Sequence, residues 1–502
     1  MNHQLRSDPD GAWYLGEHLL HPGGDPLAAA RRDLHRLLAT AGPQDLLVLA
    51  GGGLGWHARA VLDAGGPALV TYEPDPATRR AMAQHGPACD QHEVAADPDA
   101  LAELLARHLV YRQVRRVAVF APPAYRALAP QVVETARQVV AETTRRRMVD
   151  QATRRTKNIL WLQHLVDNFK HILKLPDATG LAGSLAGVPA LVVGAGPSLD
   201  QSLATIAANR DKLLIIAAAS ALAPLRSVGV YPEVAVALEA RDESRQFAGA
   251  DQQATVLAAA SASNPRHFTA WRGMRAVYHL QPWMAELAGT GLVLPSGGHA
   301  GSAAFSLAIV WGCDPVVLVG QDLAYTGGRF HAGGRPGGEN YDRPDTVDIP
   351  AIGGGVVPSS EEWISYIGWY QEAAGYLKRK GMGKRVVNAT AAGAFIPGFA
   401  HWDLGGTLAD LPRRPPWDPG LRAALQDSPR PDPAAVAQRL EAARAEAQEA
   451  LARLAAGEPA PPGSAAAWVL EAVEPATEPG AAMDNLKYLL KSLDAMKEAL
   501  HA

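Results

Sequence analysis

Residues 189–200 read PALVVGAGPSLD and combine three local signals. The apolar run at 190–193 is typical of a buried strand. Gly194 and Gly196 allow a sharp turn, because a residue without Cβ tolerates close approach. Ser198, with a glutamine three residues on, has capping-box spacing, which predicts that a helix begins there. Together these features predict an anion site suited to a nucleotide phosphate, although any doubly wound sheet uses similar tight turns.

Further short apolar runs after this stretch predict more strands of the same sheet. They lie at 212–218, 233–238, 255–259, 276–280 and 315–319, with a helix over 302–311 before the last. Alternating strands and helices predict a largely parallel α/β sheet, whose ligand binds at the carboxyl ends of the strands. The candidates at these ends are the segment 194–200, Ser220, Glu239, Ser296, Gly297, Gly298, Gln321 and Asp322.

An earlier segment repeats the pattern of strand, glycine loop, helix and strand. An apolar run at 45–50 precedes GGGLG at 51–55, and a second run at 67–72 ends at Glu73. This order is typical of a dinucleotide or S-adenosylmethionine site, with Glu73 as the ribose ligand. No hydride-transfer or methyl-transfer site follows, so a purely structural Rossmann-like unit is the alternative.

Composition excludes several classes of protein. The chain has 502 residues and a formal net charge of −4, which argues against coating nucleic acid or an anionic membrane by bulk charge. Its two cysteines, Cys89 and Cys313, predict neither a disulfide framework nor a CxxC metal site. The N-terminal residues lack an apolar signal core, and no apolar run is long enough to span a membrane. We therefore expect a cytoplasmic protein.

The pattern predicts four parts. They are an N-terminal Rossmann-like domain at 1–145, a connecting helix at 146–180, a central domain at 181–412 and a C-terminal helical domain at 413–502. Arginines and a lysine at 145–157 precede the amphipathic stretch 159–175, and leucines recur at helical spacing at 440–454 and 486–496. In the central domain, the glycine-rich segment 325–341 predicts a lid, and a helix is expected from Ser359 or Ser360 to about residue 380.

Several motifs of the central domain carry a family resemblance. They are GAGPSLD at 194–200, PSGG at 295–298, GQDLAYTGGRFH at 320–331, SSEEW at 359–363 and VVNAT at 386–390. In order and spacing they resemble the motility-associated factor (Maf) family of flagellin glycosyltransferases. The central domain of that family is similar to bacterial sialyltransferases that use CMP-sialic acid. This chain departs from the pattern at Ala391 and Ala392, where an acidic residue and Gly are expected, and at Glu239, where Asp is more usual.

The resemblance implies transfer of a nonulosonic acid, of the pseudaminic or legionaminic acid type, from a CMP donor to Ser or Thr hydroxyls of flagellin. It assigns Gly194, Gly196, Pro197 and Ser198 to the donor phosphate or ribose. Ser220, Glu239, Gln321 and Ser296–Gly298 would bind the rest of the donor. We expect neither a tightly bound cofactor nor a metal, because no HExxH or clustered Asp/His set is present.

The catalytic candidates follow from the chemistry of an activated sugar. His331 is the candidate general base, because an imidazole has a pKa near the operating pH; alternatively it only holds the lid closed. Tyr325 and Ser302 are candidates to stabilise the charge that grows on the phosphate. Asp322 is expected to orient a neighbouring group or bind a substrate hydroxyl, unless it is a structural carboxylate.

Two other functions stay open. Archaeal 6-hydroxymethylpterin diphosphokinases share a related central domain, but they would need ATP and Mg²⁺, and this chain has no GxxxxGK[ST] loop. A non-catalytic nucleotide-sugar binding protein is the other alternative, which the changes at 391 and 392 allow. The C-terminal helices are expected either to pack on the core or to dock flagellin.

Overall fold

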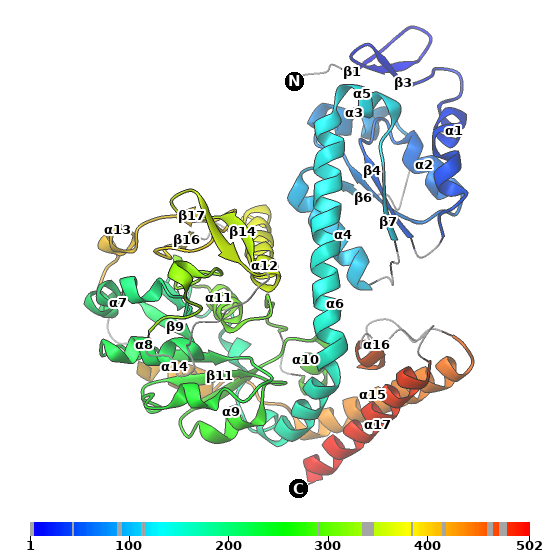
Figure 1. The fold of residues 1–502 in the computed structure, drawn as a ribbon. Coiled ribbons are helices and arrows are strands. Elements are labelled where there is room, and N and C mark those ends of the chain that lie inside the picture. The colour runs from blue at the N-terminus through cyan, green and yellow to red at the C-terminus, as the bar shows by residue number, and fades with distance from the viewer. Residues whose placement is uncertain are drawn as a thin grey trace. The chain divides into compact units, whose positions relative to one another are not determined.

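The computed structural model describes residues 5–42, 45–87, 93–111, 114, 116–289, 292–333, 346–382, 385–413, 418–458, 465–470 and 479–501. The chain forms two compact units, Met1–Gln151 and Ala152–Ala502. The division falls within helix α6 (Pro130–Ile172), whose beginning packs in the first unit and whose end packs in the second (Figure 1). The amphipathic stretch at 159–175, expected within a connecting helix at 146–180, thus falls mostly in the last part of a longer helix that ends at Ile172. The finer four-part division stays a prediction.

The first unit contains a four-stranded parallel sheet of order β6-β5-β4-β7. Its strands are β4 (Asp45–Ala50), β5 (Ala68–Tyr72), β6 (Glu93–Ala95) and β7 (Arg116–Phe120). Its helices are α1 (Pro26–Leu38), α2 (Trp56–Asp63), α3 (Pro76–His85), α4 (Pro98–Tyr111) and α5 (Pro123–Leu128). A small antiparallel sheet precedes them, with β1 (Leu5–Ser7), β2 (Trp13–Leu15) and β3 (His18–His21). The Rossmann-like pattern predicted for residues 45–73 is therefore confirmed.

The second unit contains an eight-stranded parallel sheet of order β12-β11-β10-β9-β8-β13-β16-β17. Its strands are β8 (Ala190–Val193), β9 (Leu214–Ala218), β10 (Val234–Ala237), β11 (Val256–Ala260), β12 (Arg275–Tyr278), β13 (Val316–Val319), β16 (Val386–Asn388) and β17 (Ala400–His401). A separate hairpin joins β14 (Val347–Pro350) and β15 (Val356–Ser359). The largely parallel α/β sheet is thus as predicted.

Helices cover both faces of this sheet. They are α7 (Leu199–Ala208), α8 (Leu222–Ser227), α9 (Pro265–Ala270), α10 (Pro282–Ala288), α11 (Ala300–Trp311), α12 (Glu361–Arg379), α13 (Leu404–Ala409) and α14 (Asp418–Gln426). Successive residues of β8 face different cores, because Ala190 and Val192 pack with α11 whereas Leu191 and Val193 pack with α7. All four are fully buried, which explains why the sequence shows a continuous apolar run and not an alternating one.

The C-terminal helices are α15 (Pro433–Ala455), α16 (Ala465–Leu470) and α17 (Pro479–His501). Leu440, Leu486 and Leu493 are buried in one cluster with the end of α6 and with residues of β10–β12. These helices therefore pack on the core of the second unit, which is one of the two roles expected for them. Across the described ranges, no helix is both long enough and apolar enough to cross a membrane.

The strand order places a topological switch point between β8 and β13. From β8 the chain proceeds through β9, β10, β11 and β12 in one direction, whereas β13 pairs on the other side of β8 and leads to β16 and β17. The loops that leave two such strands at their carboxyl ends separate and open a crevice, which is where open α/β sheets bind ligands. The loops concerned are the 194–198 turn after β8 and the Gly320–Asp322 segment after β13.

Candidate active site

Asp322, which follows β13, accepts two hydrogen bonds from Ser198, the N-cap residue of α7. The Ser198 backbone N–H donates to Oδ2 at 3.0 Å and the Ser198 hydroxyl donates to Oδ1 at 2.7 Å. A Cβ on Gly196 would lie 2.1 Å from Asp322 Oδ1, so this contact needs glycine. The predicted start of the helix at Ser198 is confirmed. The predicted capping box is wrong, because the Ser198 side chain makes no hydrogen bond to the first turn of α7.

The α7 N-terminus consequently holds a carboxylate of the protein itself. Asp322 is 1 % exposed, and burial raises the pKa of its carboxyl to about 6 against the opposing effect of the hydrogen bonds from Ser198. A ligand phosphate at the Ser198 N–H would have to displace a buried carboxylate that already accepts this bond. Asp322 is therefore hydrogen-bonded to the end of the glycine turn, and its role in catalysis stays a prediction.

Gln321 carries a buried amide at the same switch point. Its side chain is 3 % exposed, and within the described part of the chain its Nε2 atom has no hydrogen-bond partner. A Cβ on Gly194 would lie 2.8 Å from Nε2, and a Cβ on Gly301 would lie 2.6 Å from it. The amide thus lies between the glycine turn and the first turn of α11. A buried N–H donor without an acceptor costs free energy, so a ligand acceptor suits this position.

The PSGG loop is held against the beginning of α11 by hydroxyl groups. Ser302 accepts a bond from Gly297 N–H at 2.9 Å, donates to His299 O at 2.7 Å and lies 3.1 Å from the Ser296 hydroxyl. Gly298 N–H donates to Ser296 Oγ at 3.2 Å. His299, the N-cap residue of α11, makes no side-chain hydrogen bond to the first turn. The helix dipole and its first-turn N–H groups therefore favour an anion at this end.

The described part of the lid lies over the glycine turn. His331 Nδ1 lies 3.2 Å from Ala195 O, and Ala332 N–H donates to the same carbonyl at 2.9 Å. Because a carbonyl oxygen only accepts, the imidazole proton must be on Nδ1 when this bond forms, and Nε2 then keeps its lone pair. The structure thus brings His331 to the turn, with one nitrogen suited to accept a proton. Lid residues 334–341 lie outside the described residues.

Two further groups of contacts hold the lid. Arg329 Nη1 donates to Asp200 Oδ2 at 2.7 Å, in the first turn of α7. Tyr325, which is buried, and Phe330 pack on Trp363 at the start of α12, with ring centroids 4.7 and 4.9 Å from its ring. The sequence analysis missed these partners, because Arg329 and Asp200 are 129 residues apart and no local spacing links them.

Ser220 and Glu239 lie farther along the same edge of the sheet. Ser220 is half-buried after β9, one strand from β8, and Glu239 is exposed after β10, two strands away. Cα positions on adjacent strands lie about 4.8 Å apart, so Glu239 follows a strand about 10 Å from the glycine turn. These residues line the carboxyl edge without joining the cluster around Asp322.

In the first unit, the N–H groups of the glycine loop are hydrogen-bonded to other residues of the same unit. The Glu73 carboxylate is buried and accepts bonds from Gly52 N–H at 2.9 Å, from Asp75 N–H at 3.1 Å and from the Tyr125 hydroxyl. Gly53 N–H donates to that hydroxyl at 3.1 Å, and Leu54 N–H donates to a histidine of β3 at 3.1 Å. The groups expected to hold a pyrophosphate and a ribose are thus bonded to each other, which favours the purely structural alternative.

No metal centre is evident in the part of the chain that the structure describes, where no three His, Cys, Asp or Glu side chains lie together in a way that could hold an ion. Cys313 is buried, whereas Cys89 lies outside the described residues.

The fold and the position of the site define a doubly wound α/β protein with a ligand crevice at a topological switch point. Residues 163–328 match the family model described as 6-hydroxymethylpterin diphosphokinase MptE-like. No curated protein matches the sequence significantly. A solved structure of a Maf glycosyltransferase from Magnetospirillum magneticum AMB-1 is similar over 99 % of this chain and 90 % of its own, with a TM-score of 0.50 and 15 % identity. The predicted resemblance to Maf proteins is thus confirmed at the level of the fold.

Proposed function

We propose that this chain is a glycosyltransferase that moves a nonulosonic acid of the pseudaminic or legionaminic acid type from a CMP donor to Ser or Thr hydroxyls of flagellin. The reaction would take place in the cytoplasm and serve flagellum assembly and motility. One observation carries the proposal: at the switch point, Gln321, Asp322 and His331 converge on the glycine turn. The shared fold with a Maf glycosyltransferase supports the reaction class.

The donor's anionic groups fit the α11 side of the crevice better than the α7 side. The α7 N-terminus already binds Asp322, whereas Gln321 Nε2 lies unpartnered, among the described residues, beside Gly301 in the first turn of α11. The hydroxyls of Ser296 and Ser302 bond to the N–H groups of the PSGG loop and hold this loop against the beginning of α11. A phosphate or sugar carboxylate at α11 would satisfy the amide and gain from the helix dipole.

The chemical step exchanges one bond at the anomeric carbon for another. The bond from that carbon to the phosphate oxygen breaks, and its electron pair stays on the departing CMP. A bond to the acceptor hydroxyl oxygen forms, and the hydroxyl proton passes to Nε2 of His331. Donor groups around Gln321, Ser302 and Tyr325 would stabilise the charge that the phosphate gains. Asp322 contributes indirectly by fixing the glycine turn.

A pterin diphosphokinase is the second candidate, favoured by the family model that matches residues 163–328. Such an enzyme would transfer a diphosphate from ATP, and it would need Mg²⁺ to neutralise the phosphates. The two candidates differ in the nucleotide that they recognise.

Thermal unfolding in the presence of each nucleotide separates the two candidates. At 100 times its dissociation constant a ligand stabilises the folded state by about 2.7 kcal/mol. We expect CMP and CTP to raise the Tm, and ATP with Mg²⁺ and a pterin to leave it unchanged. The opposite pattern would favour the diphosphokinase. Stabilisation by CMP without any sugar transfer to an acceptor would favour a non-catalytic binding protein.

A further inference from the structure

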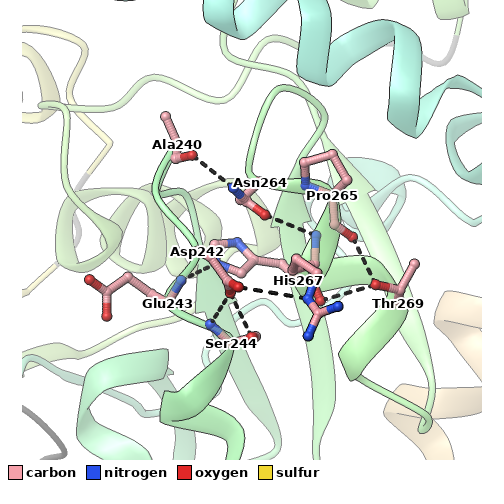
Figure 2. Close-up of polar contacts among 9 residues, drawn as sticks. Ala240, Asp242, Glu243, Ser244, Asn264, Pro265, His267 and Thr269 are labelled. Carbon is pink, nitrogen blue, oxygen red and sulfur yellow. Dashed lines mark hydrogen bonds and ion pairs between the residues drawn. The ribbon is translucent and has the colours of Figure 1, made fainter.

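Glu239 is exposed in the loop that follows β10. This loop is hydrogen-bonded to the neighbouring turn between β11 and α9. Asn264 makes two of these bonds: its backbone N–H donates to Glu239 O at 2.9 Å, and its side-chain Nδ2 donates to Ala240 O at 3.0 Å. Figure 2 shows the second bond, which joins Asn264 to Ala240 across the two loops.

The same asparagine also caps α9. Its side-chain Oδ1 accepts a bond from Arg266 N–H at 3.0 Å, so both ends of the amide are occupied. A second contact comes from His267, which is buried and whose Nε2 accepts the Glu243 N–H at 3.2 Å (Figure 2). Burial lowers the pKa of His267 to about 4, so near neutral pH Nε2 keeps the lone pair that this bond needs.

The chemistry of Glu239 limits what it can bind. An ionised carboxylate only accepts hydrogen bonds and repels other anions, so neither the phosphate nor the sugar carboxylate of the donor suits it. The hydroxyl groups of a ribose are donors that carboxylates bind in other nucleotide sites. Glu239 follows a strand two strand spacings, about 10 Å, from the glycine turn, and a ribose phosphate together with a glutamate side chain can bridge that distance.

We propose that Asn264 is a positioning residue, which holds Glu239 at the carboxyl edge so that its carboxylate can accept a bond from the 2′-hydroxyl of the donor's ribose. This proposal rests on the proposed function, because the ribose belongs to a cytidine nucleotide. Asn264 itself does not touch the ligand. It acts by fixing two consecutive carbonyls, those of Glu239 and Ala240, in the loop that carries the carboxylate.

The substitution Asn264→Asp tests this role with little risk to folding. Aspartate has the same shape and is an equally good N-cap residue, so α9 keeps its cap. It lacks the amide donor, however, and places a carboxylate oxygen opposite Ala240 O. Asn264→Ser is the second variant, since serine also caps a helix but is one atom shorter. Thr269→Ala is the matched control, because this exposed hydroxyl on α9 bonds only to carbonyls of its own helix.

Calorimetric titration of the full chain with CMP and with 2′-deoxy-CMP gives the readout. We expect Asn264→Asp and Glu239→Ala each to weaken CMP binding by about fivefold, the factor that one lost hydrogen bond represents, and to leave 2′-deoxy-CMP binding unchanged. The double variant should bind CMP no more weakly than either single variant. Thr269→Ala should bind both nucleotides like the wild type.

The positioning role would be overturned if the two losses of CMP affinity multiplied in the double variant, or if CMP and 2′-deoxy-CMP lost affinity equally. Either result would leave the glycosyltransferase proposal intact. A wild-type chain that binds neither nucleotide would overturn the proposed function together with this inference.

Discussion

His331 is the residue on which the proposed proton transfer depends. With the Nδ1 proton bonded to Ala195 O, Nε2 keeps a lone pair for the acceptor hydroxyl. We predict that His331→Ala lowers the rate of sugar transfer by roughly 10²- to 10⁴-fold, the usual contribution of a general base, while CMP binding stays within about twofold. Single-turnover transfer rates and calorimetric titration with CMP measure the two quantities.

His331→Gln is the matched control for this prediction. A glutamine amide can still donate to Ala195 O and hold the lid, but it cannot accept the proton at neutral pH. It should therefore be about as slow as His331→Ala. Wild-type transfer by His331→Gln would show that this residue only closes the lid.

Because of the buried carboxyl of Asp322, we predict that the stability of the folded protein falls as the pH rises. Burial raises the pKa of this carboxyl from 3.8 to about 6, so the folded state binds its proton more tightly than the unfolded state does. Its contribution is then fully present below about pH 4 and is lost as the pH rises through 6, a total on the order of 3 kcal/mol. Asp322→Asn does not titrate. The stability of the wild type relative to Asp322→Asn should therefore fall between pH 4 and pH 6.

Chemical denaturation of both proteins across that range measures the difference, and titration of the remaining groups cancels in it. A difference that stays level across that range would instead show that the hydrogen bonds from Ser198 outweigh burial, so that the pKa of Asp322 is not raised.

At the scale of elements, the glycine turn between β8 and α7 depends on Asp322. A Cβ on Gly196 would lie 2.1 Å from Asp322 Oδ1 and 2.6 Å from Cγ, so the carboxylate would have to leave the Ser198 N–H. We predict that Gly196→Ala destabilises the protein by about 2 kcal/mol or more, because it leaves buried polar groups unsatisfied, and that it weakens CMP binding. Denaturant unfolding and nucleotide titration measure both effects.

The control for that prediction is Gly420→Ala in α14, where an added Cβ would meet no atom of a neighbouring described residue within 4 Å. It should leave stability unchanged or raise it slightly, because alanine favours helices. If both variants had the same stability as the wild type, Asp322 would not need the space at Gly196.

The elements that the sequence predicted well were long or continuously apolar. A continuous apolar run marks the strand at 190–193. Local sequence signals of a helix mark the helix capped by Ser360 and the last helix. The β1–β3 sheet and the β14–β15 hairpin were missed, since their strands are three or four residues long and partly polar. The cap of α7 could not be predicted locally, because Asp322 lies 124 residues from Ser198.

At the scale of the whole molecule, two Rossmann-like patterns have different environments. In the second unit the strand order creates a switch point, and a buried amide, that of Gln321, lies there without a partner among the described residues. In the first unit the glycine loop is bonded to Glu73, Tyr125 and His21. Both loops have similar sequences, so only the tertiary partners distinguish a candidate ligand site from a structural turn.

The central claim is transfer of a nonulosonic acid to flagellin, and intact mass spectrometry tests it most directly. Flagellin would be co-expressed with this chain in a host that supplies CMP-pseudaminic or CMP-legionaminic acid, and with His331→Ala as the inactive control. We predict a gain of whole sugar masses on Ser or Thr that requires the wild-type chain. An unchanged flagellin mass with both donors, in a host where an established Maf enzyme modifies flagellin, would contradict the claim.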